Sequence, residues 1–212
     1  YWSVGKKDKS NAMKINKVFL PFIIFSVFAQ SCEYQDAGVE STGDVGTGGS
    51  MARFTIANNH LYTVDNENLK VFDLSAAENP VYKKDLYVGF GVETIFPLNE
   101  NLFLGTNNGM YIYDISTPVS PTQVSFYEHV IACDPVVSDG RFAYVTLSST
   151  RDMCWRSVDE LQIIDLQNIK KPQLIKRQEM EGPRGLAIRN DSLWACDNGI
   201  KIYDVKDKNN IQ

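Results

Sequence analysis

Residues 69–73 read Leu-Lys-Val-Phe-Asp, and the pattern returns as Met-Tyr-Ile-Tyr-Asp at 110–114, Leu-Gln-Ile-Ile-Asp at 161–165 and Ile-Lys-Ile-Tyr-Asp at 200–204. The closing aspartates lie 41, 51 and 39 residues apart. A period near 40 residues, built from short apolar segments, is typical of repeat folds in which one sheet cannot bury both of its faces alone. The repeat therefore predicts an all-β fold, a β-propeller of four-stranded antiparallel blades.

Each repeat contains short segments rich in Val, Ile, Tyr and Phe, separated by Asn, Asp and Gly turns that supply the positive φ angles of tight hairpins. We predict innermost strands near 53–56, 94–98, 135–138 and 185–188. About four blades are expected in 51–212. The fourth lacks the sequence of a last strand, so we expect a partial, C-terminally truncated propeller.

Residues 1–50 differ in composition from the repeats. Lys14 and Lys17 precede the apolar run 18–28, which is too short to span a bilayer and has the layout of a secretory signal. Ala29-Gln-Ser-Cys32 resembles a bacterial lipoprotein box, which implies lipidation of Cys32; the alternative is an ordinary cleavage site before a cysteine. We interpret 1–12 as a non-native or over-extended leader, 13–31 as the signal peptide and 32–50, rich in Gly, Ser and Thr, as a flexible tether.

The charge balance bears on partners. Residues 1–31 hold five Lys and one Asp, so the remainder carries 16 basic and 25 acidic side chains, a net charge of −9. A nucleic-acid partner would require a basic face, so none is expected. A protein or a glycan is the expected ligand, and the membrane is contacted through the lipid anchor.

The third repeat carries an insertion. Residues 148–160 replace the tight turn between its second and third strands, and long loops on rigid scaffolds are often functional. By propeller topology this insertion lies on the same face as the segment 129–134. We name this the insertion face. Cys133 and Cys154 are expected to form a disulfide there, with a Cys154–Cys196 bridge or three free thiols as the alternatives.

Candidate binding residues gather on the insertion face. Counting back from each second strand leads to one position at the start of each innermost strand, held by Ala52, Glu93, Asp134 and Arg184. These side chains are expected around the mouth of the central channel, where they either bind a polar ligand or form a solvated salt-bridge rim. The full candidate set is Glu93, His129, Asp134, Trp155, Arg156 and Arg184.

Other chemistry finds little support. The sequence has no CxxC pair, and its two histidines, His60 and His129, lie in different repeats, so no metal site is expected. It has no Gly-x-Ser-x-Gly nucleophile elbow and no complete phosphate-binding loop. We therefore assign no catalytic residue and no cofactor. His60 is expected to be a solvated turn residue, and the repeat aspartates are expected to bind backbone N–H groups of the next loop. Aromatic residues are expected to pack between blades: Phe72, Tyr113 and Tyr203.

The four quoted phrases resemble the LVIVD-repeat family of bacterial and archaeal surface proteins, and Asp114-Ile-Ser-Thr-Pro118-x-x-Pro121 resembles its full pattern most closely. Segments 89–97, 132–137 and 195–199 are similar to Bacteroidetes-type lipoproteins of that family. The resemblance implies a β-propeller that is exported and lipid-anchored in the outer membrane, facing the periplasm or the cell surface. Arg184-Gly-Leu186 stands where relatives often carry His-Gly-Leu. We predict a non-enzymatic binding module of the cell envelope; the alternative is a hydrolase or lyase at the channel mouth.

Overall fold

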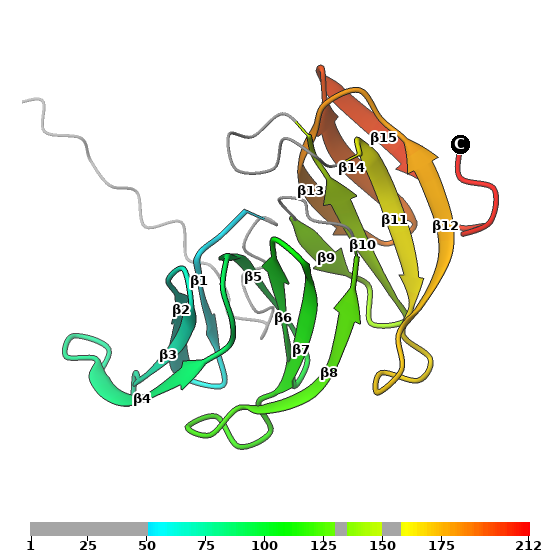
Figure 1. Ribbon diagram of the computed structural model, residues 1–212. Coiled ribbons are helices and arrows are strands. Elements are labelled where there is room, and N and C mark those ends of the chain that lie inside the picture. Colours follow the sequence, from blue (N-terminus) through cyan, green and yellow to red (C-terminus); the bar gives the residue numbers. More distant parts are fainter. Residues whose placement is uncertain (1–50, 130–134, 150–157) are drawn as a thin grey trace, which may run out of the picture. The chain divides into compact units, whose positions relative to one another are not determined.

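The computed structural model describes residues 51–129, 135–149 and 158–212, all of which belong to the compact unit Gly43–Gln212 (Figure 1). The described residues form strands and turns and no helix, and hence no helix long and apolar enough to cross a membrane. The strands are β1 (Phe54–Ala57), β2 (His60–Val64), β3 (Asn68–Asp73), β4 (Val81–Tyr87), β5 (Val92–Leu98), β6 (Asn101–Thr106), β7 (Gly109–Asp114), β8 (Thr122–Glu128), β9 (Val136–Ser138), β10 (Phe142–Leu147), β11 (Glu160–Asp165), β12 (Gln173–Glu179), β13 (Pro183–Arg189), β14 (Ser192–Asp197) and β15 (Ile200–Asp204).

The strands assemble into four antiparallel sheets, which confirms the predicted fold. Blade 1 has the order β1-β2-β3-β4, blade 2 β5-β6-β7-β8 and blade 3 β9-β10-β11-β12, while blade 4 contains β13-β14-β15. The predicted innermost strands correspond to β1, β5, β9 and β13 within two residues at each end. The turn prediction also holds, since Asn58, Asn59, Asn99, Asn190 and Asn198 adopt φ angles between 48° and 58°.

One loop geometry recurs in all four blades. The repeat aspartate ends the third strand, and its carboxylate accepts the backbone N–H two residues later: Ser75, Ser116, Gln167 and Lys206, at 2.7, 2.7, 2.6 and 2.9 Å. These bonds confirm the expected role of the aspartates. Each aspartate pairs with the residue eight positions later, where the fourth strand begins, namely Val81, Thr122 and Gln173. We call the segments between these paired residues connectors.

Blades stack face against face. Blade 1 covers blade 2 with Tyr62, Val64, Leu69 and Val71, which meet a blade 2 surface that includes Ile95 and Tyr113. A second cluster continues through blades 2, 3 and 4, and Tyr203 packs against it. The face of a blade that contacts the following blade is named here its trailing face, and the face that contacts the preceding blade its leading face. Strand alternation assigns successive residues to opposite faces, so one blade cannot be removed without exposing both kinds of surface.

Two sequence expectations need adjustment. His60 was expected to be solvated, but its ring is half-buried, with Nδ1 2.7 Å from the Asn58 carbonyl oxygen and the ring centroid 6.4 Å from that of Tyr62. The reason is that His60 is the first residue of β2 and pairs with both Ala57 and Asp73, so the sheet holds it. Phe72 lies on the leading face of blade 1 and packs edge-on against Tyr82 of the same blade. Tyr113 and Tyr203 pack between blades as expected.

Candidate functional site

The insertion face is built from the turns between second and third strands and the loops that lead into the next blade. Val88 N–H and Val92 N–H donate to the carbonyls of Glu67 and Asn66, at 2.9 and 3.0 Å. His129 N–H donates to the Asn108 carbonyl at 3.2 Å in the next blade. These bonds tie each turn to the following loop, so both lie on one face, as the topology predicted.

Glu93 and Arg184 occupy equivalent irregular positions at the starts of β5 and β13. The pairing of β5 with β6 shifts between Val92 and Thr94, so Glu93 lies at a bulge. The pairing of β13 with β14 shifts between Pro183 and Leu186, a stretch that contains Arg184. Bulges at strand ends redirect side chains out of the regular ladder. Glu93 is half-buried and Arg184 is exposed.

The Arg184 backbone is held by the neighbouring blade. The buried Thr146 hydroxyl of blade 3 donates to the Arg184 carbonyl at 2.8 Å. The main chain is therefore anchored by a contact between blades while the guanidinium faces outward. This combination gives a charged group a defined origin.

A hollow of about 230 Å³ adjoins Arg184 and was not expected from the sequence. It is lined by Arg184, Glu181, Gly182, Cys196, Asp197, Asn198 and Gly199. Cys196 is a free, exposed thiol. These residues come from the start of β13 and the turn after β14, so the hollow opens on the insertion face.

The floor of this hollow is a buried, fully engaged carboxylate. Asp197 Oδ1 accepts the N–H groups of Glu181 and Gly182 at 2.9 and 2.7 Å, and Oδ2 lies 2.7 Å from Lys201 Nζ. Burial acts to raise the pKa of Asp197, but the Lys201 contact and the two backbone bonds outweigh it and the pKa is lowered. Asp197 therefore holds the hollow's shape. Asp65 takes the same place in blade 1 with Lys70, a parallel that could have revealed this pair in the sequence.

The described ends of the insertion are joined by one residue pair. Asp159 accepts the Ser149 backbone N–H at 2.8 Å and the Ser149 hydroxyl at 2.5 Å. Beside it, Arg177 donates to Glu160 at 2.6 Å, Gln162 donates to the same carboxylate at 2.7 Å, and Tyr127 donates to Gln162 at 2.9 Å. His129 is half-buried next to this chain, with its ring 6.3 Å from that of Tyr127.

Several predicted site residues lie outside the described residues: Cys32, Cys133, Asp134, Cys154, Trp155 and Arg156. Lipidation, the Cys133–Cys154 bridge and the insertion's part in binding therefore stay predictions. Within the described part of the chain, no group of three His, Cys, Asp or Glu side chains is arranged to hold a metal ion.

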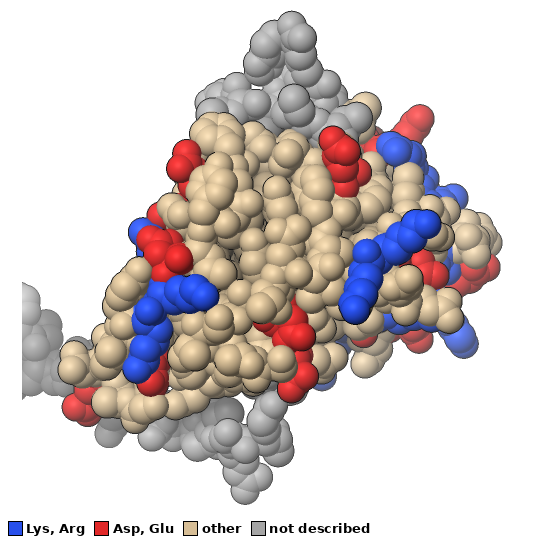
Figure 2. All heavy atoms as spheres, turned by 60° about the horizontal axis from the view of Figure 1, so that its bottom comes forward, with Lys and Arg blue, Asp and Glu red and all other residues tan. Residues whose placement is uncertain are grey.

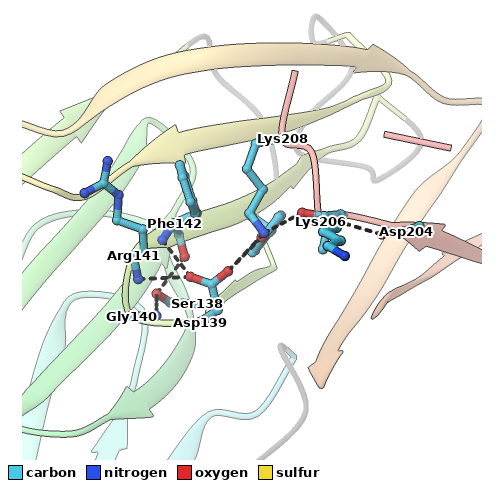
Figure 3. Close-up of polar contacts among 10 residues, drawn as sticks. Ser138, Asp139, Gly140, Arg141, Phe142, Asp204, Lys206 and Lys208 are labelled. Carbon is cyan, nitrogen blue, oxygen red and sulfur yellow. Dashed lines mark hydrogen bonds and ion pairs between the residues drawn. The ribbon is translucent and has the colours of Figure 1, made fainter. Parts of the chain in front are cut away.

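The opposite face carries the connectors, and Figure 2 turns it toward the reader. Acidic and basic side chains lie in separate small groups on the visible surface, and neither sign forms a continuous patch. In Figure 3 the Asp139 carboxylate accepts the N–H groups of Phe142 and Arg141 at 2.7 and 2.9 Å, and it faces Lys208 at 3.6 Å. The Tyr144 hydroxyl also donates to Asp139, at 2.8 Å. This cluster joins blade 4 to blade 3.

Solved structures with the same arrangement of blades have unrelated sequences. The chain matches BamB from Moraxella catarrhalis with a TM-score of 0.53 and 13% identity, over 70% of this chain and 41% of BamB. It matches a Lactobacillus plantarum protein with a TM-score of 0.58 and 14% identity, over 78% of this chain and 54% of that protein. The N-terminal domain of Nup159 gives a TM-score of 0.51 and 12% identity, over 77% and 43%.

The fold is that of a β-propeller. The chain spans about half the length of the solved proteins it matches. No protein-family model matches the sequence, and no curated protein matches it. At this level of identity the likeness concerns the fold alone.

Proposed function

We propose that this protein is a membrane-tethered propeller of the LVIVD-repeat type that binds a protein or glycan at the bacterial cell envelope without transforming it. The observation that carries the proposal is the hollow beside Arg184. An outward-facing guanidinium stands there on a backbone fixed by Thr146, above a floor shaped by the buried Asp197. A guanidinium offers five donors in a rigid fork, which suits carboxylate and sulfate groups of acidic sugars and protein side chains.

The character of the perturbed carboxylates supports binding over catalysis. Asp65, Asp73, Asp114 and Asp197 have lowered pKa values because each accepts hydrogen bonds from turn N–H groups, from Ser or Lys side chains, or from both, which outweigh desolvation. A carboxylate poised as a general base needs the opposite shift. These four groups fit the work of fixing turns, which keeps the insertion face rigid.

Attachment to the outer membrane is the second part of the proposal. The signal-like run 18–28 and the Ala29-Gln-Ser-Cys32 box support it, and 33–50 would let the propeller reach its ligand. We expect Cys32→Ala to move the protein from the membrane to the soluble fraction, because acyl chains supply the apolar anchor. Intact-mass analysis of the mature protein tests this directly, and an unlipidated Cys32 would contradict it.

Two arginines of one strand provide a matched binding test. The full chain carrying Cys32→Ser is applied to arrays of acidic glycans and of cell-envelope proteins, together with Arg184→Ala and Arg189→Ala. Both arginines are exposed on β13, at opposite ends. Loss of a charge-assisted hydrogen bond is worth about 1.5–3 kcal/mol, so Arg184→Ala should weaken the captured ligand about tenfold or more, with Arg189→Ala unchanged. Equal losses in both variants, or chemical change of the ligand, would overturn the proposal.

A further inference from the structure

The trailing face of blade 4 is exposed at positions that are buried in every other blade. Ile200 and Ile202 of β15 are 75% and 62% exposed. Counted from the repeat aspartate, their counterparts are Leu69, Met110 and Leu161 for Ile200, and Val71, Ile112 and Ile163 for Ile202. All six counterparts are 0% exposed. The three other blades therefore act as an internal control for what this surface is built to do.

The second and first strands of blade 4 repeat the comparison. Trp194 of β14 is partly exposed, whereas Tyr62, Phe103 and Tyr144 at the same repeat position are buried. Trp194, Ala187 and Ile200 border an apolar hollow of about 360 Å³, whose lining also includes Met51. Buried tyrosine and tryptophan normally find a polar partner for their tip, and Tyr62 finds one in the next blade, at the Pro118 carbonyl.

Blade 1 shows the complementary feature on its leading face. Phe54 of β1 is 62% exposed, whereas its counterparts Ile95, Val136 and Leu186 are 0%, 0% and 4% exposed. Ile56 beside it is 53% exposed. Leu61 and Phe72 continue the same face through β2 and β3, because the pairing aligns Ile56 with Leu61 and Leu61 with Phe72.

We propose that the trailing face of blade 4 receives the leading face of blade 1 from a second copy of this chain. The chain itself supplies both halves of the contact, in the register that joins blade 1 to 2, 2 to 3 and 3 to 4. Blades 1 and 4 stand at the two ends of the row of blades (Figure 1). Two copies related by a two-fold axis would form this contact twice and close one ring.

The coverage of solved propellers favours a second copy as the occupant. The described blades correspond to 41%, 54% and 43% of the three solved chains, so two copies supply about the length of one such propeller. Scattered exposed apolar residues are ordinary, but a continuous patch across adjacent strands marks an interaction surface. Each contact would bury Ile200, Ile202 and Trp194 of one copy against Phe54 and Ile56 of the other.

Mass measurement with three variants tests the proposal. The full chain carrying Cys32→Ser is examined by light scattering and native mass spectrometry from 1 to 100 μM (about the range in which such contacts are populated), alongside Ile202→Asp, Phe54→Lys and the control Ile175→Asp. Ile175 is a partly exposed apolar residue on the outer strand β12, away from both end faces. We expect a dimer for the parent and for Ile175→Asp. Ile202→Asp and Phe54→Lys should each raise the dimer dissociation constant about 100-fold, because each buries an unpaired charge.

A mixing experiment separates loss of contact from loss of folding. Ile202→Asp and Phe54→Lys place opposite charges on facing surfaces, so an equimolar mixture should recover a heterodimer that neither variant forms alone. Misfolded variants would not recover it. A parent that remains monomeric at 100 μM, or a dimer that survives Ile202→Asp and Phe54→Lys unchanged, would overturn the proposal.

Discussion

The hydroxyl of Tyr62 in blade 1 donates a 3.0 Å hydrogen bond to the carbonyl of Pro118, which lies in the connector of blade 2. The same connector is reached by Lys84 Nζ, which donates to the Ser120 hydroxyl at 3.1 Å. One blade thus holds the loop of the next by polar contacts at the rim of an apolar interface. Blades 2 and 3 repeat the arrangement through Ser125, whose hydroxyl donates to the Ile169 carbonyl at 2.6 Å.

Removing the Tyr62 hydroxyl should loosen blade 1 from blade 2. Tyr62→Phe keeps the buried ring and leaves the Pro118 carbonyl without this donor, so we expect a loss of about 1 kcal/mol of unfolding free energy. Chemical denaturation measures it. Tyr87→Phe is the matched control, because Tyr87 is largely exposed on β4 and should change nothing measurable. Equal effects of the two substitutions would show that the hydroxyl bond does not contribute.

The buried Asp197 should contribute more than any exposed turn aspartate. Asp197→Ala removes the acceptor of two backbone N–H groups and of Lys201 at a site with 1% exposure. We expect a loss of about 2–3 kcal/mol, since buried donors are left without a partner. Asp204→Ala is the control, because that carboxylate accepts only one printed backbone bond, from Lys206 at an exposed turn. An Asp197→Ala protein as stable as Asp204→Ala would contradict the account.

The same carboxylate predicts a pH dependence. Because the folded state lowers the pKa of Asp197, its charged form stabilises the fold at pH values above its unfolded pKa of about 3.9. That stability is lost as the pH falls through the lower folded value. The stability gap between the parent and Asp197→Asn should therefore be constant from pH 7 to 5 and shrink below pH 4. A gap that widens on acidification would have the wrong sign.

Lys208 should fasten blade 4 to blade 3. Its ammonium lies 3.6 Å from Asp139 and 5.1 Å from the centroid of the Phe142 ring, and it donates to the Val205 carbonyl. Lys208→Met keeps the apolar stem and removes the charge, so about 1 kcal/mol should be lost. The neighbouring Lys206→Met is the control, since Lys206 is exposed (Figure 3). Faster amide exchange in β13–β15 of Lys208→Met alone would identify the affected contact, and identical exchange in both variants would refute it.

The insertion prediction can be tested by peptide mapping without reduction. Cys133 and Cys154 would close a loop of about 20 residues, worth roughly 3 kcal/mol by chain entropy if the geometry is unstrained. We expect one cross-linked peptide holding both cysteines and an alkylated Cys196, which is free and exposed. Recovery of Cys133 and Cys154 both alkylated before reduction would rule the bridge out.

The sequence allowed the blades to be predicted because their spacing is repeated. The aspartates mark the third strand in every blade, and the alternation of apolar residues around them fixes which side chains are buried. Counting from the second strands also placed Glu93 and Arg184 at equivalent positions, although that count could not show the bulges that redirect them.

Contacts between distant segments were harder to predict. Asp197 and Lys201 are close in sequence, but the burial of the carboxylate and its bonds to Glu181 and Gly182 depend on how β13 meets β14. The Ser149–Asp159 pair was missed because serine and aspartate are ordinary loop residues. His60 was misjudged because a residue next to a turn can still be the first paired residue of a strand.

The most direct test of the central claim is hydrogen exchange measured at the equivalent third strands. If each blade is covered by the next one, amides of β7 and β11 should exchange far more slowly than those of β15 in a dilute monomeric sample. The reason is that Met110, Ile112, Leu161 and Ile163 are buried between blades, whereas Ile200 and Ile202 are not. Equal protection of β7, β11 and β15 under those conditions would contradict the blade-by-blade account.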